Sequence, residues 1–166
     1  MKSKTEKIAF VIAILILLGY ATAIFMGVKF LKNHIFIAKD FLTSRQFISI
    51  MEEEDFEVEK IKGSELDDSL NVEEAYRADN DDYEIEFYTF SNVDDAKDFY
   101  EKYKDKFDSN SANKKVNLSG TNYAVCTVVN GKKYKFVERI EKTVLLIETE
   151  SSYEKQIDKV LKVLGY

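Results

Sequence analysis

The longest run of apolar positions in the chain extends from Ile8 to Val28 and contains no charged residue. Lys7 and Lys29 stand directly on either side of it. As a helix rising ~1.5 Å per residue, the run would cover roughly 30 Å, which is about the thickness of the hydrocarbon layer of a bilayer. The pattern therefore predicts a cytoplasmic tip and transmembrane anchor at 1–32, a juxtamembrane stalk at 33–42 and an extracytoplasmic domain at 43–166.

Two other interpretations of the apolar run remain open. A secretory signal peptide would be cleaved after the triplet Ala21–Ala23, but the chain stays apolar through Ile24 and Val28, which favours an uncleaved anchor. A helix buried in a soluble protein would need apolar surroundings on all sides, and no other segment is apolar enough to supply them. Long acidic domains are exported largely regardless of their charge, so we expect a single-pass protein of the cell membrane with its N-terminus inside.

Small residues recur every four positions within the predicted anchor, at Gly19, Ala23 and Gly27. Residues at this spacing share one helix face and let two transmembrane helices approach closely. The pattern predicts a homodimer formed through the transmembrane helix. The alternative is that Gly and Ala are simply common in such helices.

Beyond the predicted stalk, helical and alternating patterns of apolar residues follow one another. Thr43 and Gln46 form a capping-box pattern that predicts a helix ending near Glu54. Asn130–Gly131 predicts a tight hairpin turn. We expect the other helices to begin at Ser91 and Ser151, the strands to lie at 56–61, 74–79, 83–87, 123–129, 134–140 and 144–147, and the polar stretches 62–72 and 108–122 to be loops.

This order of elements predicts an α+β domain, in which an antiparallel sheet has its helices packed on one face. The strand at 144–147 is apolar on both sides and should lie near the centre of the sheet. The order strand, strand, helix occurs at 74–107 and again at 134–165. It indicates either a duplicated unit or two occurrences of a common motif.

Composition limits the partners and the chemistry. From Asn33 onward the chain has 19 basic and 29 acidic residues, a net charge of −10, which excludes a nucleic acid partner. Twelve Phe and ten Tyr residues provide a core to bury. His34 and Cys126 are the only residues of their kinds, and the six glycines are scattered. We therefore predict no catalytic residue, no metal ligand and no cofactor.

Acidic residues are numerous, and they raise two possibilities, calcium binding and hydrolysis by paired carboxylates. The run Asp79–Asp82 is dense in oxygen ligands but lacks the glycine and the glutamate that a calcium-binding EF-hand loop requires. Paired carboxylates could also serve a small envelope hydrolase. No two acids stand out from the others, so this hydrolase is the alternative to a binding function.

Charge is unevenly distributed along the domain. From Glu52 to Glu86 there are sixteen acidic residues against three basic ones, whereas Ser109 to Val137 contains no acid. The five lysines of the second stretch are the predicted contact surface for an unknown envelope protein or an anionic polymer: Lys114, Lys115, Lys132, Lys133 and Lys135. The alternative is a solvated surface whose charges pair within the fold.

The domain also resembles a known class of proteins. The order of elements, together with Asp82–Phe87, Arg139–Thr143 and the closing Leu164–Tyr166, is similar to that of small extracytoplasmic domains of Firmicutes, many of which are lipoproteins. This chain lacks the N-terminal cysteine of a lipoprotein, and the apolar run would replace the lipid as its anchor. The resemblance implies a membrane-tethered, non-catalytic binding or accessory module of the cell envelope, and it implies no active-site residue.

Overall fold

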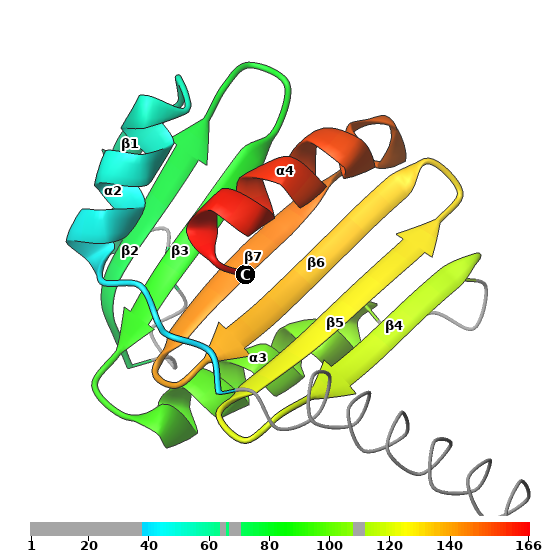
Figure 1. The fold of residues 1–166 in the computed structure, drawn as a ribbon. Coiled ribbons are helices and arrows are strands. Elements are labelled where there is room, and N and C mark those ends of the chain that lie inside the picture. Colours follow the sequence, from blue (N-terminus) through cyan, green and yellow to red (C-terminus); the bar gives the residue numbers. More distant parts are fainter. Residues whose placement is uncertain (1–37, 64–65, 67–70, 108–111) are drawn as a thin grey trace, which may run out of the picture. The chain divides into compact units, whose positions relative to one another are not determined.

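A seven-stranded antiparallel sheet is the framework of the unit that spans Ala38 to Tyr166 (Figure 1). The structure is a computed structural model that describes residues 38–63, 66, 71–107 and 112–166. Within these ranges the strands are β1 (Glu57–Lys60), β2 (Val72–Asp79), β3 (Glu84–Phe90), β4 (Lys114–Ser119), β5 (Tyr123–Asn130), β6 (Lys133–Ile140) and β7 (Thr143–Glu150). The α-helices are α2 (Ser44–Glu53), α3 (Val93–Phe107) and α4 (Glu154–Leu164), and a 3₁₀ helix, η2 (Ser151–Tyr153), precedes α4. The strand order is β1-β2-β3-β7-β6-β5-β4.

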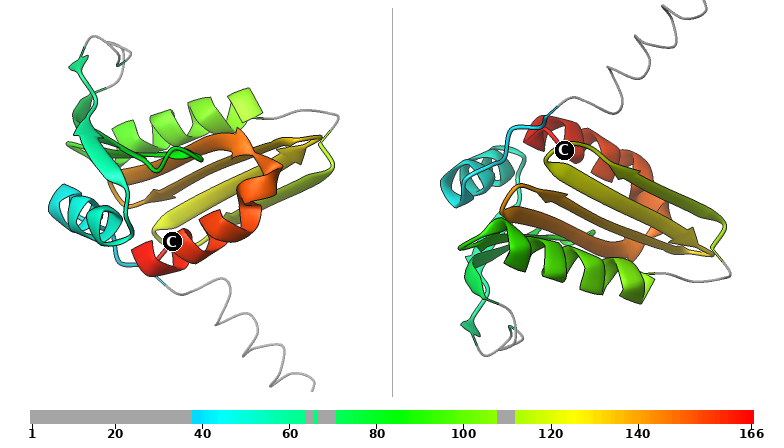
Figure 2. Two further views of the ribbon diagram at one scale, coloured as in Figure 1. Left: turned by 90° about the horizontal axis from the view of Figure 1, so that it is seen from above. Right: turned by 90° about the horizontal axis from the view of Figure 1, so that it is seen from below.

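The predicted α+β class with an antiparallel sheet is confirmed, but the helices cover both faces. Helices α2 and α4 lie on one face and α3 lies on the other (Figure 2). The expectation of helices on one face was wrong because the central strands are apolar on both sides. In β3, Phe87 is buried in the cluster under α2 and α4, whereas Tyr88 and Phe90 are buried in the cluster under α3. Each apolar face needs its own cover.

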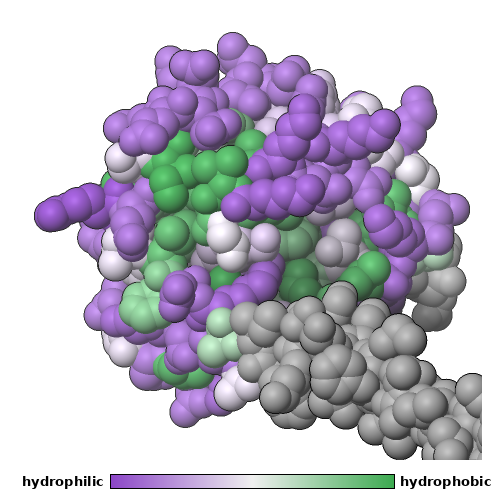
Figure 3. Space-filling model, in the orientation of Figure 1, coloured by the Kyte–Doolittle hydropathy of each residue, from purple (hydrophilic) through white to green (hydrophobic). Residues whose placement is uncertain are grey.

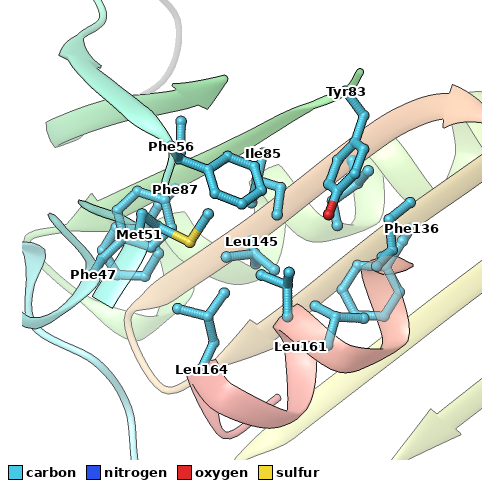
Figure 4. Close-up of a cluster of buried hydrophobic side chains, with 14 of the residues drawn as sticks. Phe47, Met51, Phe56, Tyr83, Ile85, Phe87, Phe136, Leu145, Leu161 and Leu164 are labelled. Atoms are coloured by element: carbon cyan, nitrogen blue, oxygen red, sulfur yellow. The ribbon is translucent and has the colours of Figure 1, made fainter. Parts of the chain in front are cut away.

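The core beneath α2 and α4 is built largely from aromatic and branched side chains (Figure 4). The rings of Phe47 in α2 and Phe87 in β3 stack with their centroids 4.7 Å apart. Leu161 and Leu164 of α4 are buried in the same cluster. The predicted capping box fixes the start of α2, since the Thr43 hydroxyl accepts from the Gln46 backbone N–H and the Gln46 side chain accepts from the Thr43 N–H.

The order strand, strand, helix occurs twice, as β2-β3-α3 and as β6-β7-α4. Strands β3 and β7 are antiparallel neighbours, and β7 is the fourth strand of seven, which confirms its central place. A two-fold axis perpendicular to the sheet, between β3 and β7, would relate these antiparallel strands and would place both helices on the same face. Because α3 and α4 lie on opposite faces, the two units are not related by such an axis.

Two local predictions were wrong. The expected loop 108–122 contains the edge strand β4, whose residues are mostly exposed and polar, so its sequence carries little strand signal. The helix starts also differ from the prediction. Asn92, and not Ser91, caps α3 by accepting from the Asp95 N–H at 2.9 Å, and α4 has no side-chain cap.

No helix within the described ranges is long and apolar enough to cross a membrane. The predicted anchor at Ile8–Val28 and its small residues Gly19, Ala23 and Gly27 lie outside the described residues, as does His34. Their assignment remains a prediction from the sequence.

Candidate functional site

The sheet has two ends of different character. At one end, residues 38–42, which we call the strap, lie against the turn that follows β4 and against Glu138 near the end of β6. We call this the strap end. At the opposite end are the turn between β2 and β3 and the turn between β5 and β6, where Asn130 pairs with Lys133. We call this the hairpin end.

The structure brings the five predicted contact lysines to the hairpin end. The predicted turn between β5 and β6 is confirmed, with Gly131 at φ 59° and Lys132 between the paired residues Asn130 and Lys133. Strand β4 begins beside this turn, because the Gly131 N–H donates to the Asn113 side-chain oxygen at 2.7 Å. Lys114 and Lys115 therefore lie next to the turn that carries Lys132.

The five lysines are not one continuous cationic surface. Lys114 donates to Glu154 of α4 at 2.7 Å, whereas Lys135 lies on the α3 face, 3.5 Å from Glu148 and 5.0 Å from the centre of the Phe107 ring. The hydrogen bond to Glu154 raises the pKa of Lys114.

Lys132 and Lys133 differ from these paired lysines. Both are exposed, and neither has an ion pair in the part of the chain that the structure describes. Glu150 lies across the ladder from Lys133 without forming a salt bridge to it. These two side chains present exposed cations at the turn between β5 and β6.

Two hollows adjoin at Glu148 and form a groove at the hairpin end. One hollow, of about 310 Å³, is lined by Lys132, Lys133, Tyr134, Lys135, Glu148, Thr149 and Glu150. The other, of about 220 Å³, is lined by Glu84, Glu86, Tyr103, Lys106, Leu146 and Glu148. The groove thus carries four glutamates and four lysines, and its charge is balanced.

The second hollow lies where the middle of the sheet opens. Pairing between β3 and β7 stops at Glu86 and Leu146, although both strands continue beyond these residues. On either side the ladders run further, to Asp79–Glu84 between β2 and β3 and to Lys133–Glu150 between β6 and β7. The two halves of the sheet therefore separate at this point.

The carboxylates of the second hollow are engaged by neighbouring donors. Glu86 accepts from the Tyr88 hydroxyl at 2.6 Å and from Arg77 at 3.0 Å. Glu148 accepts from Lys106 at 2.7 Å, and this bond raises the pKa of Lys106. The hollow is lined by structural ion pairs and not by a carboxylate set apart for proton transfer, so nothing here favours the hydrolase alternative.

The acidic turn Asp79–Asp82 uses its side chains to close the backbone. Asp79 accepts from the Asp81 N–H at 2.8 Å, and Asn80 accepts from the Tyr83 N–H at 3.1 Å. In the described ranges, no group of three or more His, Cys, Asp or Glu side chains is placed to hold a metal ion. Cys126 is buried in β5.

The strap end contains an ion pair that sequence patterns did not indicate. Glu138 of β6 is 1% exposed, and the Lys39 ammonium group donates to it at 2.6 Å. Burial raises the pKa of Glu138, and the bond from Lys39 partly opposes this effect. The sequence signal for this pair is one acidic residue within the apolar strand at 134–140. This signal does not indicate which basic residue pairs with the acid.

The Asn122 side chain holds the backbone of the strap. It accepts from the Lys39 N–H at 3.0 Å and donates to the Lys39 carbonyl at 2.8 Å, so the amide pairs with the chain as a neighbouring strand would. The Lys39 ammonium group also lies 5.1 Å from the centre of the Tyr123 ring. Leu42 packs against the core. The described part of the predicted stalk is thus attached to the domain.

Comparison with known proteins gives one distant likeness. A GTP binding regulator from Thermotoga maritima has 14% sequence identity over 75% of this chain and 88% of its own, with a TM-score of 0.46. A likeness at this level carries no argument about function. No protein-family model and no curated protein sequence matches the chain.

Proposed function

We propose that this protein is a membrane-tethered, non-catalytic binding module of the cell envelope, and that its hairpin end contacts the partner. One observation carries the proposal. Lys132 and Lys133 are exposed without ion pairs beside a hollow of about 310 Å³, at the end of the sheet opposite the strap. A chain tethered through its N-terminus leaves that end free to meet a partner.

The chemistry of the hairpin end suggests an anionic partner. Because the domain carries an excess of acidic residues, most of its surface repels an anionic polymer or an acidic protein. Two unpaired cations at one turn provide a local exception and would orient the approach. The paired lysines Lys114 and Lys135 contribute less, since their charges are already balanced within the fold.

The test uses the full chain in lipid nanodiscs with poly(glycerol phosphate) as the anionic probe. Binding should weaken as salt is raised, because charges at an exposed turn are screened beyond ~8 Å at physiological ionic strength. The double variant Lys132→Glu and Lys133→Glu should abolish retention of the probe. A matched control, Lys60→Glu with Lys62→Glu, makes the same charge change at exposed positions at the end of β1 that lies away from the hairpin end.

Equal loss of binding in both double variants would assign the effect to net charge and would refute a specific role for the hairpin end. If neither added salt nor charge reversal changes the binding of the probe, the contact lies on another surface.

A further inference from the structure

Exposed apolar side chains gather at the strap end. In the described ranges, the large hydrophobic residues left exposed are Phe41 (44%), Leu118 (55%) and Val163 (50%). Phe41 belongs to the strap itself. Leu118 pairs with Val125 near the turn that holds Asn122, and Val163 lies in the last turn of α4.

The three segments that carry these side chains lie on one face of the domain. The strap lies on this face because Leu42 packs against the cluster under α2 and α4. The last turn of α4 is fixed at the strap end, because the hydroxyl groups of Tyr166 and Thr143 lie 3.1 Å apart. Lys114 reaches α4 through Glu154, so alternation along β4 places Leu118 on the α4 side as well. Figure 3 shows this face, with apolar side chains in green among charged ones in purple.

The chain between the predicted anchor and the strap is short. If the anchor ends at residue 32, five residues separate it from Ala38, where the described unit begins. Even when fully extended at 3.3–3.6 Å per residue, they would reach roughly 18 Å. The strap is in turn fixed to the domain by Lys39, so the strap end cannot move far from the surface that holds the anchor.

The strap end carries exposed basic side chains for contact with lipid. Arg45 at the start of α2 and Lys162 near the end of α4 are both exposed at the strap end. The acidic turn Asp79–Asp82 lies at the hairpin end, where Glu57 pairs with Asp79. An anionic headgroup layer would attract Arg45 and Lys162 and repel the acidic turn. It would also attract Lys132 and Lys133, so the short tether, and not charge, selects the strap end for this contact.

We propose that the strap end of the domain rests on the anionic lipid surface of the membrane that holds the anchor, with Phe41, Leu118 and Val163 entering the headgroup layer and Arg45 and Lys162 contacting lipid phosphates. This inference rests on the proposed membrane tether. Aromatic and aliphatic side chains flanked by basic residues bind the interface through both apolar burial and attraction to anionic lipid. The contact holds the hairpin end away from the bilayer.

The absence of tryptophan from the chain permits a direct test. The full chain is reconstituted in vesicles that contain phosphatidylglycerol and lipids brominated near the headgroup, with one tryptophan introduced as Phe41→Trp or Val163→Trp. The matched control is Glu57→Trp, at an exposed position of the hairpin end. We expect quenching and a blue shift at positions 41 and 163 and neither at position 57.

Charge reversal provides the second arm. Arg45→Glu with Lys162→Glu should weaken the surface contact by roughly fivefold or more for each basic residue lost from an anionic surface. Lys133→Glu with Lys155→Glu, at the hairpin end, should leave quenching unchanged. In vesicles of neutral lipid the two double variants should behave alike.

Failure of the tether and failure of the surface contact give different results. Release of the chain from vesicles by alkaline carbonate would refute the membrane tether itself. Retention of the chain with equal quenching at positions 41, 163 and 57 would refute only the lipid contact. A blue shift of the tryptophans at positions 41 and 163 that appears only at a high protein-to-lipid ratio would show that another copy of the chain, and not lipid, covers the strap end. This result would also overturn the proposal.

Discussion

Lys39 and Glu138 are joined by an ion pair of 2.6 Å although 99 positions separate them in the chain. Glu138 is almost fully enclosed, whereas Lys39 keeps part of its side chain in solvent. Lys39 is therefore a structural residue of the domain as well as the point where the tether meets it.

Removing one member of this pair should destabilise the domain. In Lys39→Met, Glu138 would remain buried without its cation, and we expect a loss of about 2–3 kcal/mol in the free energy of unfolding, below the usual cost because Lys39 is partly exposed. The double variant Lys39→Met with Glu138→Leu should recover most of this loss. Urea unfolding of the full chain in detergent, followed by tyrosine circular dichroism, measures both. A double variant no more stable than Lys39→Met would contradict the role of the pair.

The pH dependence of stability should carry the signature of Glu138. Its pKa is raised in the folded protein from an ordinary value of 4.5, chiefly by burial. The stability that comes from the protonated carboxyl is therefore fully present below pH 4.5 and is lost as the pH rises through the folded pKa. As the pH rises through the folded pKa of Glu138, the free energy of unfolding of the natural protein should fall relative to that of Glu138→Gln. In Lys39→Met this fall should extend to higher pH, because the bond from Lys39 no longer opposes the effect of burial. Parallel pH profiles for the natural protein and Glu138→Gln would refute the assignment.

Gly120 provides a steric test of the strap end. A Cβ at this position would lie 2.0 Å from the Tyr123 ring, whose face is occupied by Lys39. Gly120→Ala should displace the ring and lower the free energy of unfolding by about 1–3 kcal/mol, which is typical of overpacking. Gly63→Ala is the control, because a Cβ there meets no atom within 4 Å. Thermal unfolding of the two variants compares them directly, and an equal shift in Tm would contradict the predicted clash.

Sequence patterns identified the elements whose signals are local. The capping box of Thr43 and Gln46, the hairpin at Gly131 and the central strand at Val144 each depend on neighbours within a few positions. Strand β4 was missed because an exposed edge strand needs no apolar alternation. The second helical layer was missed although Tyr88 and Phe90 of β3 already indicated a second apolar face.

The candidate site was predicted only in part. The turn signal brought Lys132 and Lys133 together correctly, but Glu154 and Glu148, which neutralise Lys114 and Lys135, come from segments that no local pattern connects to them. The same holds for Lys39 and Glu138. Ion pairs between distant segments depend on how the strands are ordered in the sheet, and periodicity does not report that order.

The short ladder between β3 and β7 has a consequence for how the domain assembles. Every other pairing in the sheet joins strands that follow one another along the chain, so β1-β2-β3 and β4-β5-β6-β7 are two meanders of local hairpins. The ladder from Glu86–Leu146 to Thr89–Thr143 is the strand pairing that joins them within the sheet. Because it closes the longest loop between paired strands, we expect it to form last. We expect the two meanders to behave as separate cooperative units in native-state hydrogen exchange, with the amides of this ladder exposed first when the halves part.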